Sequence, residues 1–307
     1  MTGSPEQSRM PDFFIVGHHK SGTTALYEML RAHPQIFMPS VKEPRFFDHD
    51  LHALGATGRP QRTLSEYLAL FDGAAPGQRL GEASPSYLRS RVAASAIAEM
   101  APRARCIAIL REPASFVRSL HSQLVQEHVE TELDLARAFA GERRERGGQT
   151  VNRYSDHVHY VEQLRRFEDA FPREQLLVLI YDDFRSDNDA TVRRVLRFLG
   201  VDEDARIEAR EANRSVALRS PRLDRLVRRA YGPSGAGSRA ARNAVRALAP
   251  ERLRTRFLPA LRRRLVYREQ EPFDPELEAR LRERFSGEVH ALSEYLGRDL
   301  ESLWGYR

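Results

Sequence analysis

Four short segments of the chain are predicted to be strands, at residues 13–16, 79–83, 105–110 and 176–181, and the first and last of them are mainly apolar. The last run is rich in leucine, isoleucine and valine and lacks polar alternation, which is typical of a strand covered on both faces of a parallel sheet. Stretches with helical spacing lie between the strands, near residues 89–101, 113–127, 153–171 and 189–200. This order predicts a doubly wound α/β fold with a mainly parallel central sheet flanked by helices, and a ligand at the carboxyl ends of the strands.

The chain has 307 residues, enough for one large α/β domain, and we expect a single domain with insertions. Residues 1–11 are expected to form a disordered tail. The strongly charged segment 128–152 predicts either an exposed helix and loop or a mobile flap over an acceptor site. Residues 232–264 begin with the glycine-rich stretch 232–237 and then carry many arginines. This predicts a flexible connection into basic helices with a solvated face or with affinity for an acidic polymer or a membrane surface. A last helix is expected over residues 274–297.

The net charge of +6 and the pI near 9.7 favour anionic ligands, although the 43 acidic residues predict a surface of mixed sign. No apolar stretch approaches the roughly 20 residues that span a bilayer, and the N-terminal residues lack the apolar core of a signal peptide. These features predict a cytoplasmic protein, with peripheral membrane contact left open and no oligomeric state indicated. The single cysteine, Cys106, lies in an apolar run and is predicted to be a packed core thiol.

Only two of the 49 lysines and arginines are lysines, and one of them, Lys20, lies in a glycine-bracketed turn, residues 17–24 (GHHKSGTT). The turn follows the first strand and leads into a helix, so backbone amides lie at the positive end of a helix dipole. Such a site binds anions, and the compact Lys20 ammonium can reach a phosphate or a bridging oxygen. The order differs from the G-x-x-x-x-G-K-[ST] loop of nucleoside triphosphatases, because Lys20 precedes Gly22 by two positions.

Residues 20–26 (KSGTTAL) resemble the K-x-G-T-x-A-L core of the sulfotransferases that use 3'-phosphoadenosine 5'-phosphosulfate (PAPS). The resemblance implies a P-loop-like domain in which this loop holds the 5'-phosphosulfate of PAPS. It also implies that Lys20 stabilises the charge that develops on the leaving group. The cofactor-binding residues implied here are Lys20, Ser21, Gly22, Thr23 and Thr24.

A second anion site is expected where the strand at residues 105–110 ends. Pro113 is pre-organised for the first position of a helix, so Arg111 is held at the strand end and Ser119 lies about two turns into the helix. Both side chains can bind the same phosphate group. The arrangement resembles the R-x-P-x-x-x-x-x-S motif of PAPS sulfotransferases, which implies that Arg111 and Ser119 bind the 3'-phosphate of PAPS.

The candidate base is Glu43, in the sequence Lys42-Glu43-Pro44-Arg45-Phe46-Phe47. A carboxylate flanked by apolar residues can have a pKa raised towards the working pH. The segment resembles the K-E-P-x-F-F stretch of bacterial sulfotransferases and the E-x-x-F-F segment of the heparan sulfate and Golgi-type enzymes, whose glutamate takes the proton of the acceptor hydroxyl. The alternative is that Glu43 pairs with Lys42 or Arg45.

Residues 81–87 (GEASPSY) resemble the E-K-x-P-x-Y segment of the heparan-type enzymes, but Ala83 replaces the lysine. The role of that amine is therefore absent or filled by another residue such as Lys42, and a heparan-like acceptor is less favoured. Glu82 is the reserve candidate for the base. The N-x-S-x-x-x-R pattern at residues 213–219 resembles the family's nucleotide-closing loop, which implies that Arg219 lies near the 3'-phosphate.

The resemblance covers residues 12–220 and implies a PAPS-dependent sulfotransferase that moves the sulfuryl group, in line, to a hydroxyl or less readily an amine. The acceptor is a small molecule, a glycolipid or a carbohydrate, and no metal is required. One alternative is a P-loop kinase or ATPase, in which Asp182 and Asp183 after a strand bind magnesium. Another is a basic nucleic-acid-binding protein that uses residues 232–264, but the chain lacks aromatic platforms and we expect no nucleic-acid partner.

Overall fold

The computed structural model of the chain describes residues 10–53, 62–146, 149–205, 216–218, 267–269 and 272–307. They form two compact units. The larger unit contains the described residues up to Val117, those from Glu142 to residue 205, and those from Arg280 onward. The smaller unit contains Arg118–Gly141 and the described residues between 216 and 279. Residues 1–9 of the predicted tail and the predicted basic insertion, 232–264, lie outside the described residues.

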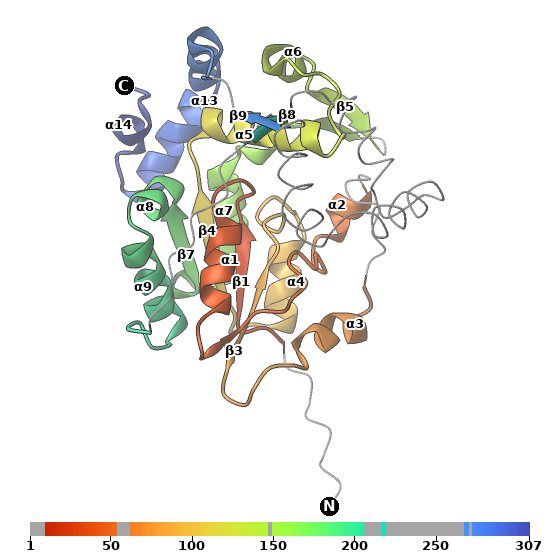
Figure 1. Cartoon of the computed structure of the whole chain (residues 1–307), viewed down its shortest axis with the longest axis vertical. Helices are drawn as coiled ribbons and strands as arrows, with labels where there is room; N and C mark the ends of the chain where they lie inside the picture. Colours follow the sequence, from red (N-terminus) through yellow and green to blue (C-terminus); the bar gives the residue numbers. More distant parts are fainter. Residues whose placement is uncertain (1–9, 54–61, 147–148, 206–215, 219–266, 270–271) are drawn as a thin grey trace, which may run out of the picture. The chain divides into compact units, whose positions relative to one another are not determined.

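A five-stranded parallel sheet with the order β2-β3-β1-β4-β7 forms the larger unit (Figure 1). Its strands are β1 (Phe13–Gly17), β2 (Ile36–Phe37), β3 (Arg79–Ala83), β4 (Arg105–Leu110) and β7 (Leu176–Ile180). In the centre, Phe13 of β1 pairs with Gly81 on one side and with Arg105 on the other. The carboxyl end of β1 is therefore the switch point of the strand order, where open α/β sheets bind their ligands.

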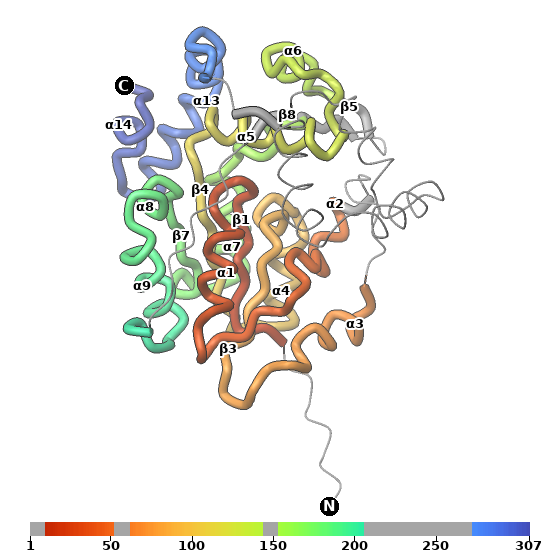
Figure 2. The backbone as a smooth tube through the Cα atoms, in the orientation of Figure 1, coloured from red at the N-terminus to blue at the C-terminus, as the bar shows by residue number. Residues whose placement is uncertain are grey.

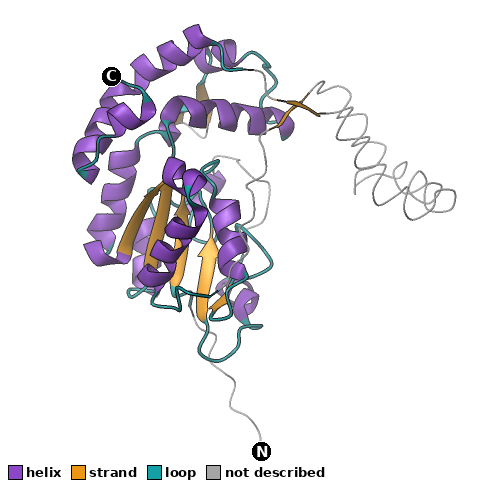
Figure 3. Ribbon diagram, turned by 60° about the vertical axis from the view of Figure 1, so that its left-hand side comes forward, coloured by secondary structure: helices purple, strands orange, loops and turns teal. Residues whose placement is uncertain are grey.

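Helices cover both faces of this sheet, as Figure 3 shows. On one face, Phe13 and Ile15 belong to a hydrophobic cluster with α1 (Thr23–Arg31), α8 (Tyr181–Ser186) and α9 (Asn188–Leu199). The alternate residues of β1, Phe14 and Val16, point to the other face and are also fully buried. Cys106 of β4 is buried as predicted, and burial raises the pKa of its thiol.

Figure 2 follows the chain through the remaining elements. In the larger unit these are α2 (His49–Ala53), α3 (Leu64–Leu68), α4 (Ala93–Met100), β5 (Arg143–Arg146), β6 (Gln149–Asn152), α7 (Tyr160–Ala170) and α14 (Leu300–Trp304), with single 3-10 turns at Ala69–Phe71, Ser155–His157 and Arg173–Gln175. The smaller unit contains α6 (Leu135–Ala140) and an antiparallel pair, β8 (Val216–Leu218) with β9 (Tyr267–Glu269). Two further helices, α5 (Pro113–Gln126) and α13 (Pro275–Leu296), cross the boundaries between the units.

The four predicted strands are confirmed, as are the predicted helices at α4, α5 and α9. The helix predicted over 153–171 begins only at Tyr160, because the carboxylate of Glu142 accepts the backbone N–H groups of Tyr154 (3.0 Å) and Ser155 (2.8 Å) and holds this stretch in a turn. The segment 128–152 contains the predicted helix, now α6, and also an unpredicted antiparallel hairpin of β5 with β6.

Helix α13 matches the predicted last helix, and its Leu281 and Leu292 are buried as the apolar spacing predicted. None of the helices in the described ranges combines the length and the apolar composition needed to cross a membrane. Pro11, at the end of the predicted tail, is buried.

The close pairing of β1 with β3 predicts that Gly81→Ala destabilises the protein. A methyl group at Gly81 would overlap the ring of Phe13 and the sulfur of Met38, both buried, so it must displace core side chains at a cost of about 1–3 kcal/mol. Urea denaturation measures the free energy of unfolding. Gly287→Ala in α13 is the matched control, because no atom of the described residues lies within 4 Å of its added methyl group, and it is expected to stabilise by about 0.5–1 kcal/mol. Equal stability of the two variants would contradict this packing.

Candidate functional site

The turn between β1 and α1 has an irregular backbone centred on Lys20. Lys20 is left-handed, with φ of 59°, and Gly22 follows with φ of 87°. A methyl group at Gly22 would lie 2.9 Å from the ring of Phe184 in α8, so this position requires glycine for its conformation and for its space. The hydroxyl of Ser21 donates to the backbone carbonyl of His19 (3.3 Å) and holds the turn closed.

Helix α1 begins at this turn, and its N-cap residue, Gly22, has no side chain to cap the first amides. Amides without an intrahelical partner, together with the helix dipole, stabilise an anion at the N-terminus of a helix. The structure therefore places the five predicted residues of the phosphate loop in one turn at the carboxyl end of β1: Lys20, Ser21, Gly22, Thr23 and Thr24.

Arg111, at the end of β4, contacts this turn directly. Its Nη1 donates to the backbone carbonyl of Lys20 (3.0 Å), and its guanidinium lies 4.8 Å from the centre of the Tyr181 ring. The hydroxyl of Tyr160 donates to the backbone carbonyl of Arg111 (2.9 Å) and fixes the strand end. Two sequence motifs that lie 91 residues apart are thereby brought together, and both present positive charge at the same edge of the sheet.

Ser119 lies in α5, two turns after Pro113, as predicted. Pro113 is the first residue of the helix, and the preceding Glu112 caps it by accepting the N–H groups of Ala114 (2.8 Å) and Ser115 (2.6 Å). The side chain of Ser119 is buried, and its hydroxyl makes no hydrogen bond within the described ranges. Ser119 belongs to the smaller unit and Arg111 to the larger one. Arg219 lies outside the described residues.

Glu43 forms an ion pair with its neighbour Lys42, with 2.6 Å between Oε1 and Nζ. This is the alternative raised by the sequence, and Arg45 pairs instead with Asp48 (2.8 Å). The Glu43 side chain is 37% exposed, and its second oxygen makes no hydrogen bond in the described parts of the chain. One carboxylate oxygen of Glu43 is therefore accessible to a ligand.

Glu82 has a different environment, because its side chain is fully buried in β3. Its Oε2 accepts hydrogen bonds from the hydroxyls of Tyr67 (2.5 Å) and Tyr87 (3.2 Å). Burial raises the pKa of Glu82 to about 7, and the nearby hydroxyl groups oppose this shift. A fully buried carboxyl has no path to an acceptor, so the structure does not support Glu82 as the reserve base.

Three histidines lie beside the phosphate loop: the ring centres of His18 and His157 are 5.7 Å apart, and that of His19 lies 6.4 Å from His157. Nε2 of His18 donates to the backbone carbonyl of His157 (2.8 Å). Burial is the main cause that lowers the pKa of His18 and of His19 to about 3, so both imidazoles are neutral near pH 7. No local sequence pattern indicated His157, which is 139 residues from His18.

No group of three or more histidine, cysteine, aspartate and glutamate side chains is placed to hold a metal ion in the ranges that the structure describes.

Left-handed backbone is concentrated at this site. Apart from glycines, four described residues have positive φ, and three of them are Lys20 (59°), Glu43 (58°) and Arg45 (56°). Such conformations cost free energy and persist where the surrounding structure holds them, typically at ligand-binding sites.

The model of the family described as "Sulfotransferase domain" matches residues 10–220. Heparan sulfate glucosamine 3-O-sulfotransferase 3B1 of Mus musculus is 28% identical over 196 residues, which cover 63% of this chain and 47% of the relative. Heparan sulfate glucosamine 3-O-sulfotransferase 6 of Homo sapiens is 29% identical over 204 residues, which cover 66% of this chain and 55% of the relative. The chain thus spans about half the length of these relatives.

Among solved structures, a sulfotransferase from Alicyclobacillus acidocaldarius has the same fold, with a TM-score of 0.70 and 26% sequence identity. The match covers 96% of this chain and 99% of that one. It confirms the predicted α/β fold with a parallel central sheet flanked by helices.

The buried carboxyl predicts a pH-dependent difference between wild type and Glu82→Gln. The pKa of Glu82 is higher in the folded state than in the unfolded state, so the wild type loses stability as the pH rises from about 4.5 towards 7, while the glutamine variant does not. The variant is expected to gain roughly 2–3 kcal/mol relative to wild type between pH 5 and pH 8. Urea denaturation at each pH tests this, with Glu99→Gln on the exposed side of α4 as control. A constant difference between the proteins across this range would refute it.

Proposed function

The chain belongs to the sulfotransferase domain family, as its motifs predicted, and on that premise we propose that it moves the sulfuryl group of PAPS to a hydroxyl of a small-molecule or carbohydrate acceptor. The observation that carries the proposal is the hydrogen bond from Arg111 to the carbonyl of Lys20 (3.0 Å). It joins the two motifs that the family uses for the two phosphate ends of PAPS, at the carboxyl ends of adjacent strands. PAPS, when bound, supplies the sulfuryl group and the adenosine 3',5'-bisphosphate leaving group.

The residues present fit an anionic nucleotide. The uncapped start of α1 and the ammonium of Lys20 offer hydrogen bonds and positive charge to the 5'-phosphosulfate, and Lys20 stabilises the negative charge that grows on the bridging oxygen. Arg111 offers a planar guanidinium to the 3'-phosphate. Ser119 and Arg219 keep their assignment to the same phosphate from the sequence motifs.

Glu43 is the proposed base. Its partly exposed carboxylate keeps one oxygen unbonded within the described residues, which leaves it available to a hydroxyl proton. Lys42 holds the other oxygen. The two relatives described above are named as 3-O-sulfotransferases, which supports a sugar hydroxyl as acceptor, while Ala83 in place of the family's lysine argues against a heparan-like chain. A glycolipid hydroxyl fits the same chemistry.

The alternative of a P-loop kinase or ATPase is opposed by the position of its supposed magnesium ligands. Asp182 and Asp183 follow the end of β7 by two and three residues and lie in the first turn of α8. The carboxylate of Asp183 accepts two hydrogen bonds from Arg298 (2.5 and 2.7 Å), and that of Asp182 accepts the indole N–H of Trp304 (2.9 Å). These acids stabilise the packing of α8, as acids in a first helical turn commonly do.

The first experiment compares ligands by thermal stabilisation. Adenosine 3',5'-bisphosphate is expected to raise the melting temperature in a concentration-dependent manner, because it binds the folded state alone. ATP with magnesium and a short DNA duplex at equal concentration are expected to have little effect. Stabilisation by ATP with magnesium, and none by the bisphosphate, would overturn the proposal in favour of a kinase.

The second experiment separates the roles of Lys20 and Glu43. Lys20→Ala is expected to lower turnover about 10²–10³-fold, since one preorganised cationic donor to the leaving group is lost. Glu43→Gln is expected to lower turnover about 10²–10⁴-fold and to keep the stabilisation by adenosine 3',5'-bisphosphate. Transfer from ³⁵S-labelled PAPS to a panel of phenols, sugars and glycolipids measures both and identifies the acceptor. Wild-type turnover in Glu43→Gln would move the base to another residue.

A further inference from the structure

A buried polar network lies beneath the segment that carries Glu43. At its centre is Glu82, whose Oε2 accepts hydrogen bonds from the hydroxyls of Tyr67 (2.5 Å) and Tyr87 (3.2 Å). All three side chains are fully buried, and Oε1 of Glu82 makes no hydrogen bond within the described residues. A buried carboxyl that accepts hydrogen bonds from two hydroxyls restricts the positions of the two tyrosine side chains.

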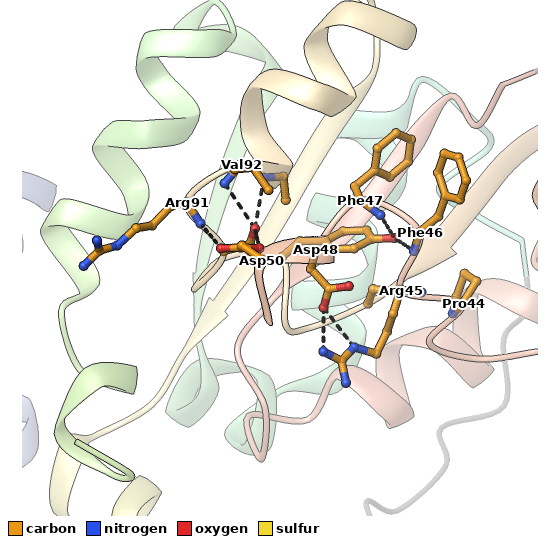
Figure 4. Close-up of polar contacts among 12 residues, drawn as sticks. Pro44, Arg45, Phe46, Phe47, Asp48, Asp50, Arg91 and Val92 are labelled. Atoms are coloured by element: carbon orange, nitrogen blue, oxygen red, sulfur yellow. Dashed lines mark hydrogen bonds and ion pairs between the residues drawn. The ribbon is translucent and has the colours of Figure 1, made fainter. Parts of the chain in front are cut away.

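Tyr87 connects Glu82 to the backbone of residues 43–48, which we call the base-bearing loop. Its hydroxyl oxygen accepts the N–H of Phe46 (2.9 Å) and of Phe47 (3.4 Å), as Figure 4 shows. A phenolic hydroxyl has one proton to donate, and that proton goes to Glu82. Glu82 therefore fixes the direction in which Tyr87 can accept from the loop.

Tyr67 holds the same two phenylalanines by ring packing. Its ring stacks on that of Phe46 (centroids 4.5 Å apart, 11° between planes) and meets Phe47 edge-on at 5.6 Å. The capping box of Thr63 and Glu66 starts the short helix α3 and so positions Tyr67. Tyr67 from α3 and Tyr87 from the turn after β3 thus both contact Phe46 and Phe47.

Further bonds tie the loop to β3 and the turn after it. The N–H of Glu43 donates to the carbonyl of Ala83 (3.0 Å), and the N–H of Arg45 donates to Oγ of Ser84 (3.1 Å). Figure 4 also shows Asp50, just beyond the loop, accepting the N–H of Arg91 (2.9 Å). Because Glu43 and Arg45 are left-handed residues, the loop keeps its shape only where such contacts hold it.

We propose that Glu82 is a positioning residue for sulfuryl transfer: through the hydroxyls of Tyr87 and Tyr67 it holds the base-bearing loop so that Glu43 faces the acceptor. This inference rests on the proposed function of Glu43. It assigns Glu82 a role that needs its oxygen as an acceptor of hydrogen bonds and does not need it to exchange a proton with the acceptor.

The experiment compares Tyr87→Phe, Glu82→Gln and Glu82→Leu with the matched control Tyr295→Phe, which removes a hydroxyl bonded to Arg173 on the surface. Formation of adenosine 3',5'-bisphosphate from PAPS is measured with the acceptor found in the panel, or with water as acceptor. Tyr87→Phe and Glu82→Leu are expected to lower kcat by roughly tenfold to a hundredfold, because a small displacement of a catalytic group has effects of this size. Glu82→Gln keeps an oxygen acceptor and is expected to stay within about threefold of wild type, by the same reasoning.

A double-mutant cycle tests whether the network acts through Glu43. In the Glu43→Gln background, Tyr87→Phe is expected to lower kcat by less than about twofold, since the group that it positions is gone. An undiminished loss in that background, or wild-type kcat in Tyr87→Phe alone, would overturn the inference. Loss of turnover in Glu82→Gln as deep as in Glu43→Gln would also overturn it, because it would make Glu82 a base.

Two readouts keep this inference separate from the proposed function. The melting temperature with and without adenosine 3',5'-bisphosphate checks that each variant is folded and binds nucleotide; the bisphosphate shift is expected to equal that of wild type in every variant. If the wild type neither binds the bisphosphate nor consumes PAPS, the proposed function itself fails. If the wild type does both and the network variants behave like Tyr295→Phe, the inference alone fails.

Discussion

The parallel pairing of β1 with both β3 and β4 is the constraint on which the site depends. Strands that run in the same direction end at the same edge, so the turn after β1, the segment after β3 and Arg111 after β4 are delivered to one place. The pairing requires the strand backbones to approach closely. At Gly81, for example, the Phe13 ring leaves no space for a Cβ atom. The same burial that stabilises the sheet thereby sets the distance between the charged groups.

The charged groups at that edge are supported by polar contacts that are partly buried. Arg111 is held by the carbonyl of Lys20 and by the ring of Tyr181, and His18 bonds the carbonyl of His157. Neutral imidazoles can lie close to several cations without adding to the repulsion, and burial keeps His18 and His19 neutral at pH 7. The proposed anion site therefore depends on cations such as Lys20 and Arg111 and not on the imidazoles.

Much of the larger unit could be predicted from the sequence because its signals are local. Unbroken apolar runs predicted β1, β4 and β7, and a proline at a helix start placed Arg111 at a strand end. Long-range contacts could not be predicted, since no local pattern indicates that His157 meets His18 or that Tyr67 meets Glu82. For the same reason the carboxylates of Glu43 and Glu82 look alike in the sequence, and only their burial separates them.

The fold gives a physical reason why position 83 carries alanine and not the family's lysine. Ala83 is almost fully buried in the hydrophobic cluster under α1, a setting in which an ammonium would be costly. Its carbonyl accepts the N–H of Glu43, so the segment that carries Lys42 passes directly beside position 83. The Lys42 ammonium, bonded to Glu43, therefore brings a positive charge close to the strand position from which the family's lysine is absent. Lys42, bonded to the proposed base, is therefore the candidate for the role of that amine.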